Sequence, residues 1–225
     1  MEHKKKSAGE KAAEYIEDGM VVGLGTGSTA YYLIKKLGTL VSQGLFIKAV
    51  MTSNATEKLA SGMNIPLLSV DEVNGIDLMI DGVDEIDSNF NAIKGGGGAL
   101  FREKLVARLS RRIIWILDDT KLVDKIGKFP LPVEILPFGH THTIKKLKKE
   151  GMNPVLRSSD EGVYITDNGN YIADLHLQQP VDIQNLDSRL KSIVGVLETG
   201  LFLNKGERMV IGTDGQPREI LNKVK

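Results

Sequence analysis

The chain has 225 residues, of which 41% are apolar and 26% charged, with 29 basic and 29 acidic side chains and no cysteine. These values are typical of a globular protein with one or two domains, and they exclude fibrous and disordered classes. Zero formal net charge argues against nucleic acid as a partner, because its phosphates attract a basic surface. The lack of cysteine excludes disulfide scaffolds and thiol catalysis. No apolar run reaches the roughly 20 residues that span a bilayer, and the polar N-terminus is unlike a signal peptide, so we expect a cytoplasmic protein with no membrane partner.

The first half of the chain alternates helix and strand patterns. Residues 4–18 have the spacing of an amphipathic helix that ends at Gly19. Asn54 and Glu57 have the spacing of a capping box at a helix start. The alternation predicts an α/β fold with a Rossmann-like, mainly parallel sheet and helices on both faces, whose ligands bind beyond the carboxyl ends of the strands. Strands are predicted at residues 20–24, 46–51, 65–68, 76–80 and 112–117, and further helices at 30–37 and 54–61.

A smaller α+β domain is predicted after residues 128–132, where two prolines interrupt the pattern. Asp167-Asn-Gly-Asn170 is a strong hairpin turn. We expect a catalytic α/β domain from residues 1–130 and 206–225, with residues 207–213 rejoining its sheet, and a small domain over 131–205. The small domain is predicted to contain strands at 133–136, 155–157, 163–166 and 171–175, and helices near 141–150 and 183–192.

The segment Gly23–Thr29 joins a predicted strand to a predicted helix, a layout in which backbone amides and a helix N-terminus bind an anion. It is not a dinucleotide fingerprint, because Ser28 stands where the last glycine is required. It also lacks the Gly-Lys-Ser/Thr of a nucleotide P-loop. We therefore predict a small phosphate-binding turn with hydroxyl groups at Thr26, Ser28 and Thr29. The alternative interpretation is that Ser28 or Thr29 only caps the helix.

Carboxylates, a lysine and glycines gather in the next part of the sequence. Asp81 and Asp84 do not have the spacing of an EF-hand calcium loop, and Asp81 directly follows an apolar strand, which argues against a merely solvated turn. Two aspartates beside Lys94 would shift one another's pKa values, as acid–base pairs in active sites do. The run Gly95–Gly98 costs about 0.5–1 kcal/mol per residue relative to alanine in a regular element. It therefore predicts positive φ or close approach to a ligand, with a flexible linker as the alternative.

Glu103 follows this run on a helix predicted to begin near Gly98. Phe101, Leu105 and Leu109 are predicted to form the buried stripe of that helix. Glu103 lies off the stripe with alanines four residues to either side, which would leave room for a ligand. The alternative is an ordinary exposed glutamate. A helix N-terminus would lower the pKa of Glu103 and a dry pocket would raise it, and the sequence does not rank the two effects.

His140 and His142 form a weak metal motif. They would place two imidazoles on one face of a strand, but no third ligand is suggested nearby, and the adjacent threonines indicate the start of a helix. We predict that the protein uses no metal and no other cofactor.

Taken together, several motifs closely resemble those of the type A family of ribose-5-phosphate isomerases. They are Gly25–Thr29, Asp81–Glu85, Lys94–Gly97 with Arg102–Lys104, Gly127–Glu134, Thr166–Asn170 and Gly200–Phe202. The resemblance covers nearly the whole chain. It implies interconversion of D-ribose 5-phosphate and D-ribulose 5-phosphate through a cis-enediolate, without metal, in the non-oxidative branch of the pentose phosphate pathway. It also implies a homodimer or homotetramer.

The same resemblance implies roles for individual residues. Glu103 would be the base that carries a proton between C1 and C2. Asp81, Asp84 and Lys94 would assist ring opening and stabilise charge at the substrate oxygens. No histidine lies near the acid cluster, so Lys94 and the glycine-run amides are the candidate electrophiles. The substrate-binding set would be Thr26, Gly27, Ser28, Thr29, Asp81, Gly82, Val83, Asp84, Lys94, Gly95, Gly96, Gly97 and Lys121.

Three other functions fit parts of the sequence. A non-catalytic sugar-phosphate sensor would keep the turn at Thr26–Thr29 without needing Glu103 or Asp81, but it would usually carry a DNA-binding helix pair, for which we see neither room nor charge. An amino-sugar-phosphate isomerase/deaminase, or a transferase of similar architecture, would be separated by product analysis. A metal-dependent isomerase would use His140 and His142, and chelation would inactivate it.

Overall fold

The computed structural model describes residues 1–177 and 182–223, and the chain divides into two compact units. Unit 1 consists of Met1–Val83, Arg102–Leu122 and Lys205–Lys225, and unit 2 of Asp84–Phe101 and Val123–Asn204. The division predicted from the sequence assigns residues 84–101 and 123–130 to the larger domain instead, and it stays a prediction. Residues 178–181 and 224–225, which it includes, lie outside the described residues.

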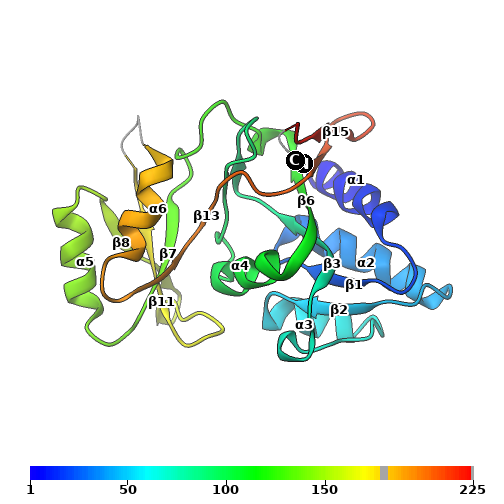
Figure 1. The fold of residues 1–225 in the computed structure, drawn as a ribbon, viewed down its shortest axis with the longest axis horizontal. Coiled ribbons are helices and arrows are strands. Elements are labelled where there is room, and N and C mark those ends of the chain that lie inside the picture. Colours follow the sequence, from blue (N-terminus) through cyan, green and yellow to red (C-terminus); the bar gives the residue numbers. More distant parts are fainter. Residues whose placement is uncertain (178–181, 224–225) are drawn as a thin grey trace. The chain divides into compact units, whose positions relative to one another are not determined.

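Unit 1 is built on a six-stranded sheet in the order β15-β14-β6-β3-β1-β2 (Figure 1). The five strands from β14 to β2 run parallel to their neighbours, and β15 pairs antiparallel with β14 at the edge. This sheet confirms the predicted α/β class, and β14 confirms that the last segment rejoins the first sheet. The strands are β1 (Val21–Leu24), β2 (Lys48–Met51), β3 (Ile76–Gly82), β6 (Ser110–Asp118), β14 (Arg208–Gly212) and β15 (Arg218–Leu221).

Helices cover both faces of this sheet. Successive strand residues point to opposite sides, so each face carries its own set of side chains to bury. On one face Val22 and Leu24 join the apolar core formed with α1, α2 and α3. On the other face Gly23 makes room for α4, since a Cβ at Gly23 would lie 2.6 Å from Cγ1 of Val106. The helices are α1 (Glu2–Ala12), α2 (Ser28–Ser42), α3 (Asn54–Ser61) and α4 (Leu100–Leu109), with short 3₁₀ turns η1 (Ala13–Tyr15), η2 (Val70–Glu72) and η3 (Asp119–Lys121).

The cap of α3 differs from the predicted one. The N-cap residue is Ser53, whose hydroxyl accepts a hydrogen bond from the backbone N–H of Thr56 at 3.1 Å. The predicted capping box of Asn54 and Glu57 is therefore wrong. Ser53 is the N-cap because its backbone is extended, as an N-cap requires, while Asn54 is already inside the helix.

Two predicted elements of unit 1 have a different extent. The helix predicted for residues 4–18 begins at Glu2 and tightens into η1, because Ile16 leaves the helical region for an extended conformation and buries its side chain. The strand predicted for residues 65–68 is wrong: Leu67 makes a single parallel bridge to Ala49. Pro66 has no backbone N–H to donate, so the ladder does not continue.

Unit 2 has α+β character, as the sequence predicted for the smaller domain. Its larger sheet has the order β12-β7-β11-β8 with antiparallel pairing, and its smaller sheet the order β13-β5-β4. The strands are β4 (Glu85–Ile86), β5 (Ala92–Ile93), β7 (Leu131–Ile135), β8 (Pro154–Leu156), β11 (Tyr171–Leu175), β12 (Val196–Thr199) and β13 (Leu201–Phe202), with a short hairpin of β9 (Ser158–Ser159) and β10 (Gly162–Val163). Helices α5 (His140–Lys149) and α6 (Ile183–Lys191) contribute Leu147, Leu186 and Leu190 to the core of this unit.

The predicted turn at Asp167–Asn170 forms, but the predicted hairpin is wrong, because β10 pairs with β9 and β11 pairs with β7 and β8. The backbone N–H of Thr166 donates to the carbonyl oxygen of Asn170 at 2.8 Å and closes the turn. The strand predicted for residues 163–166 is shorter, since β10 ends at Val163. The hydroxyl of Thr166 instead donates to Glu134, so this stretch is held by side-chain contacts.

Candidate active site

The glycine turn after β1 lies at the carboxyl edge of the unit 1 sheet, beside the end of β3. The backbone N–H of Gly25 donates to the carbonyl of Ile80 at 3.0 Å, and that of Thr26 donates to Oδ1 of Asp81 at 3.2 Å. A Cβ at Gly25 would lie 1.8 Å from the same Oδ1. Asp81 is completely buried. Glycine at position 25 is therefore the residue that lets the turn close over this carboxylate.

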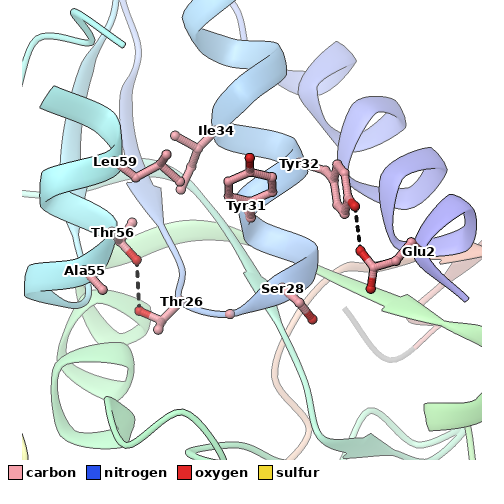
Figure 2. A pocket seen from close by; sticks show the side chains of 10 residues that line it. Glu2, Thr26, Ser28, Tyr31, Tyr32, Ile34, Ala55, Thr56 and Leu59 are labelled. Atoms are coloured by element: carbon pink, nitrogen blue, oxygen red, sulfur yellow. Dashed lines mark hydrogen bonds between the residues drawn. The ribbon is translucent and has the colours of Figure 1, made fainter. Parts of the chain in front are cut away.

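The hydroxyl of Thr26 belongs to a cluster of hydroxyl groups. It donates to Oγ of Ser53 at 2.8 Å and lies 2.8 Å from Oγ1 of Thr52. It also lies 3.2 Å from Oγ1 of Thr56, the contact drawn in Figure 2. The Thr56 hydroxyl in turn donates to the carbonyl of Gly25 at 3.2 Å. The cluster ties the glycine turn to the end of β2 and the start of α3.

Residues Gly27–Thr29 open helix α2. Its N-cap is Gly27, with φ +117° and no side-chain cap, so the interpretation of Ser28 or Thr29 as the cap is wrong. Ser28 is exposed, whereas Thr29 is 2% exposed, and its Oγ1 has no hydrogen-bond partner within residues 1–177 and 182–223. The first N–H groups of α2 and the positive end of its dipole favour an anion here.

A pocket of about 530 Å³ opens beside this turn (Figure 2). Thr26 and Ser28 line it from the turn, and Tyr31 and Leu59 line it from α2 and α3. At its rim the hydroxyl of Tyr32 donates to Oε2 of Glu2 at 2.5 Å. This hydrogen bond raises the pKa of Tyr32 and lowers the pKa of Glu2. Near neutral pH, Tyr32 therefore stays protonated as the donor and Glu2 stays ionised as the acceptor.

The second acidic turn belongs to unit 2. The backbone N–H of Gly96 donates to Oδ2 of Asp84 at 2.7 Å, and a Cβ at Gly96 would lie 2.6 Å from Oδ1. Gly95 and Gly98 have φ of +97° and +84°. The prediction of positive φ in this glycine run is confirmed. We call residues Gly95–Gly98 the glycine loop.

Lys94 precedes the glycine loop and is 2% exposed. Its backbone N–H donates to the carbonyl of Gly200 at 2.9 Å, and its Nζ lies 5.5 Å from the ring centroid of Phe202. The face of an aromatic ring attracts a cation. The Lys94 side chain is thus buried beside Phe202, where a charge acts more strongly than it does in water.

Glu103 is 3% exposed on α4, so the interpretation of an ordinary exposed glutamate is wrong. The predicted buried stripe is also wrong, because Phe101 is 39% and Leu105 40% exposed. The helix turns Glu103 and Lys104 inward instead. Carboxylates are rarely buried unless they are paired or functional, which makes this inverted pattern a signal of a site.

The third turn, η3, follows β6. Asp118 caps it by accepting from the backbone N–H of Thr120 at 3.2 Å, and Nζ of Lys121 donates to the carbonyl of Val83 at 2.7 Å. Since β1, β3 and β6 are neighbours in the sheet, the turns that carry Thr26, Asp81 and Lys121 lie at the same edge of it.

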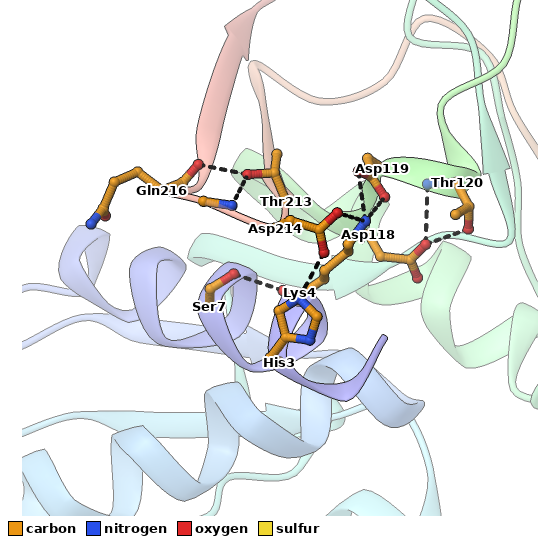
Figure 3. A network of polar contacts seen from close by, with 10 residues as sticks. His3, Lys4, Ser7, Asp118, Asp119, Thr120, Thr213, Asp214 and Gln216 are labelled. Carbon is orange, nitrogen blue, oxygen red and sulfur yellow. Dashed lines mark hydrogen bonds and ion pairs between the residues drawn. The ribbon is translucent and has the colours of Figure 1, made fainter.

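Lys4 of α1 holds this third turn from outside (Figure 3). Its Nζ lies 3.0 Å from both oxygens of Asp119 and 3.0 Å from Oδ2 of Asp214. His3 also contacts Asp214, through Nε2 at 3.0 Å. The hydrogen bond to Asp119 raises the pKa of Lys4, and the hydrogen bond from Lys4 lowers the pKa of Asp214.

The predicted site residues divide between the two units. Unit 1 carries Thr26, Gly27, Ser28, Thr29, Asp81, Gly82, Val83, Glu103 and Lys121, and unit 2 carries Asp84, Lys94, Gly95, Gly96 and Gly97. The structure joins Thr26 with Asp81 and Val83 with Lys121 in the first unit, and Asp84 with Gly96 in the second. Sequence reasoning missed Lys4 and Arg157, which contact these turns. Neither stands in a recognisable motif.

The two histidines behave as the start of a helix. His140 begins α5, and its Nδ1 lies 3.0 Å from the carbonyl oxygen of Pro137. Two residues apart on a helix, the His140 and His142 side chains do not share a face. Over the described ranges 1–177 and 182–223, no group of three or more metal-ligating side chains is found. Within the same ranges, no helix has the length and apolar character needed to cross a membrane.

Unit 1 places its turns and a buried carboxylate at adjacent strand ends, and unit 2 holds the glycine loop. These features are typical of the class of enzymes that bind small anionic substrates at the strand ends. The family model described as ribose 5-phosphate isomerase A (phosphoriboisomerase A) matches residues 48–216. The chain belongs to the ribose 5-phosphate isomerase A family.

Individual relatives agree with this assignment. Ribose-5-phosphate isomerase A of Listeria monocytogenes serovar 1/2a is 49% identical over 99% of this chain and 100% of its own length. The protein of the same name from Streptococcus pneumoniae is 48% identical over 96% of each chain. Among solved structures, ribose 5-phosphate isomerase from Plasmodium falciparum matches with a TM-score of 0.95 and 38% identity, over 99% of this chain and 100% of that one. A D-ribose-5-phosphate isomerase in complex with phospho-erythronic acid matches with a TM-score of 0.93 and 38% identity, over 97% of each chain.

Proposed function

We propose that this chain interconverts D-ribose 5-phosphate and D-ribulose 5-phosphate through a cis-enediolate, with Glu103 as the base. Membership of the family and nearly full-length relatives at 49% identity support the reaction. The complex of a related enzyme with phospho-erythronic acid supports a phosphorylated sugar as substrate. The observation that carries the assignment of the base is the burial of Glu103 on α4. The sequence pattern predicts that Phe101 and Leu105 form the buried face of this helix, but these two side chains are exposed and Glu103 is buried instead.

The chemistry requires one base and a stabilised oxyanion. A carboxylate takes the proton from C2 of the open-chain aldose, leaving a cis-enediolate with its negative charge on O1. The O2 hydroxyl proton then passes to O1, and the carboxylic acid returns its proton to C1, so that C2 becomes the carbonyl of the ketose. We assign this role to Glu103, whose single carboxylate both removes the proton from C2 and returns it to C1. Lys94 and the amides of the glycine loop stabilise the negative oxygen, as preorganised donors do in other enzymes. Asp81 and Asp84 move the hydroxyl proton during ring opening.

The phosphate group is assigned to the start of α2. Thr26, Gly27, Ser28 and Thr29 place backbone amides and hydroxyl groups there. Lys121, whose Nζ donates to the carbonyl of Val83 at the end of β3, holds the substrate with its positive charge. Gly82 and Val83 contribute backbone at the end of β3, and Gly95, Gly96 and Gly97 contribute backbone from the glycine loop. The reaction as proposed needs no metal and no other cofactor.

We further propose a homodimer or homotetramer, located in the cytoplasm, with no nucleic-acid or membrane partner. Phe138 and Val194 of unit 2 are 95% and 94% exposed. Large apolar side chains on a surface are typical of contacts between subunits. Sedimentation equilibrium would measure the number of subunits, and a monomer at micromolar concentration would contradict this proposal.

The test of the reaction compares three proteins in EDTA: the wild type, Glu103→Gln and Glu57→Gln. Glu57 is an exposed glutamate on α3, so it undergoes the same chemical change outside the site. We expect the wild type and Glu57→Gln to turn over ribose 5-phosphate equally, and Glu103→Gln to lose about 10²–10⁴-fold in kcat, the usual scale for a general base. Full activity of folded Glu103→Gln at normal KM would remove Glu103 from this role. No turnover by folded wild type would reject the reaction.

Product analysis separates the neighbouring functions. Amino-sugar phosphates offered to the same wild-type protein should give no ammonia. Binding of ribose 5-phosphate without turnover would instead favour the non-catalytic sensor, for which a buried Glu103 has no purpose.

A further inference from the structure

Arg157, just after β8, reaches the glycine loop of the same unit. Its Nη1 donates to the carbonyl oxygens of Gly95 and Gly96, at 3.0 and 3.1 Å. Its Nε and Nη2 donate to the two oxygens of Asp174, at 2.9 and 2.5 Å. The Arg157 and Asp174 side chains are only 15% and 20% exposed. A two-point pair of this kind fixes the plane of the guanidinium, and with it the direction of the remaining donor.

Tyr164 holds the next carbonyl of the loop. Its hydroxyl donates to the carbonyl oxygen of Gly97 at 3.3 Å, and its ring centroid lies 5.7 Å from Cζ of Arg157. A Cβ at Gly98 would lie 2.1 Å from the same hydroxyl, so the tyrosine fills the space that a side chain would need. Burial raises the pKa of Tyr164 above its usual 10.0, and the hydroxyl is therefore a donor at neutral pH.

The contacts to the carbonyls determine where the amides point. In a trans peptide the N–H of the following residue points away from the carbonyl. The Gly95 carbonyl faces Arg157, and the N–H of Gly96 points the opposite way, where it donates to Asp84. The Gly96 carbonyl also faces Arg157, which turns the N–H of Gly97 toward the side of the loop that Asp84 occupies.

We propose that Arg157 is a positioning residue for the isomerase reaction: oriented by Asp174, it holds the Gly95 and Gly96 carbonyls so that the N–H of Gly97 donates to the substrate oxygen that becomes negative in the enediolate. This inference rests on the proposed function. Arg157 itself touches neither the substrate nor a reacting atom in this scheme. It acts through the loop.

The main test is Arg157→Lys, which keeps a positive charge near Asp174 but loses the fork that reaches both partners at once. Removing a preorganised oxyanion donor costs about 10²–10³-fold in kcat, so a displaced donor should cost about 10–10²-fold. KM should change less than about threefold, since the lost interaction belongs to the transition state.

Arg112→Lys is the matched control. Arg112 of unit 1 also pairs with a carboxylate through two nitrogens, with Nε at 3.0 Å and Nη2 at 2.9 Å from Oε1 of Glu207. The substitution breaks an arginine–carboxylate pair away from the glycine loop, and kcat should stay within about twofold of wild type. Thermal unfolding of both variants measures the stability loss. An equal fall of kcat in the two variants would overturn the inference.

A second measurement does not depend on activity. Hydrogen–deuterium exchange of the ligand-free protein should become faster for the peptide that contains Gly95–Gly98 in Arg157→Lys, and stay unchanged in Arg112→Lys. Tyr164→Phe removes one bond to the loop and should lower kcat about two- to fivefold, which keeps a test available if Arg157→Lys does not fold.

The outcomes separate this inference from the proposed function. An active wild type with Arg157→Lys at wild-type kcat, or with unchanged exchange of the loop, overturns the inference and leaves the function standing. A folded but inactive wild type overturns the proposed function and, with it, the catalytic role of the loop.

Discussion

The glycine turn of unit 1 and the glycine loop of unit 2 each set a glycine against an aspartate. Gly25 lies against Asp81, and Gly96 lies against Asp84. In both, the carboxylate accepts a backbone N–H from the turn, from Thr26 in one case and from Gly96 in the other. The two arrangements differ in what holds the backbone in place.

In unit 1 the support comes from the sheet. The N–H of Gly25 continues the ladder to β3, and the hydroxyl cluster around Thr26 joins the next strand end. In unit 2 the support comes from the Arg157 and Tyr164 side chains, 61 to 67 positions away in the sequence from the glycines that they contact. Backbone support is rigid and is given by the fold. Side-chain support is adjustable, and single substitutions remove it.

Gly25→Ala should break the first arrangement. The new Cβ would lie 1.8 Å from Oδ1 and 2.5 Å from Cβ of Asp81, and a fully buried Asp81 has no space to withdraw. We expect a loss of about 2–4 kcal/mol in the free energy of unfolding, as for severe overpacking, and more than about 10³-fold in kcat/KM. Urea unfolding and steady-state kinetics measure the two effects. Gly62→Ala, at φ −64° with its nearest neighbour at 3.4 Å, is the control and should shift stability by less than about 0.5 kcal/mol.

Gly96→Ala should affect activity more than stability. Its Cβ would lie 2.6 Å from Oδ1 of Asp84, the far end of a side chain that swings aside. We expect kcat to fall about 10–10²-fold with about 1 kcal/mol or less lost in the free energy of unfolding. The same two assays check this. A stability loss equal to that of Gly25→Ala would contradict the contrast between the two units.

Thr26→Val isolates the hydroxyl support in unit 1 without a change of shape. It removes the donor to Ser53 and leaves the neighbouring hydroxyls one partner fewer. We expect about 1–2 kcal/mol less stability, the scale for a buried hydrogen bond with one partner removed. Thr39→Val, on the exposed side of α2, is the matched control in urea unfolding and should be close to neutral. A smaller loss at Thr26 than at Thr39 would show that the cluster does not support the turn.

Lys4→Met tests the ion pairs that hold η3, and its effect should be the smallest and should depend on pH. The pKa of Lys4 is raised, so its contribution is present below 10.5 and is lost as pH rises through the folded value. The pKa of Asp214 is lowered, so its contribution is present above 3.8 and is lost as pH falls through the folded value. The difference in Tm between wild type and Lys4→Met should therefore be largest near neutral pH and shrink at both extremes. A difference independent of pH would mean that packing, and not charge, is lost.

The sheet and its turns were predictable because they depend on local pattern. A mainly apolar run such as residues 76–80 predicts a buried strand from its own sequence, and glycines at strand ends predict turns. The orientation of α4 was not predictable in this way. Its apolar Phe101 and Leu105 are exposed and its charged Glu103 is buried, so a rule based on burial of apolar residues chooses the wrong face. Functional sites violate such rules because they keep charged groups out of water.

The supporting residues could not be found from local sequence at all. Arg157 stands between the short strands β8 and β9, and its role depends on carbonyls more than 60 positions earlier. Lys4 is the first of three successive lysines, and the contact to Asp119 lies 115 positions away. A single sequence does not contain the information that pairs such distant positions.

The place of β14 bears on how a growing chain folds on the ribosome. At Gly212, the end of this strand, a Cβ would lie 1.8 Å from the carbonyl oxygen of Lys4, so α1 packs against a strand that is synthesised only after residues 123–204. When β6 has emerged, its edge for β14 is still open, and residues 123–204 must be translated before β14 arrives. We therefore expect the nascent chain to complete unit 2 before unit 1, although unit 1 begins first. An unpaired apolar strand edge is exposed during that interval, which is when a chaperone would have the most to protect.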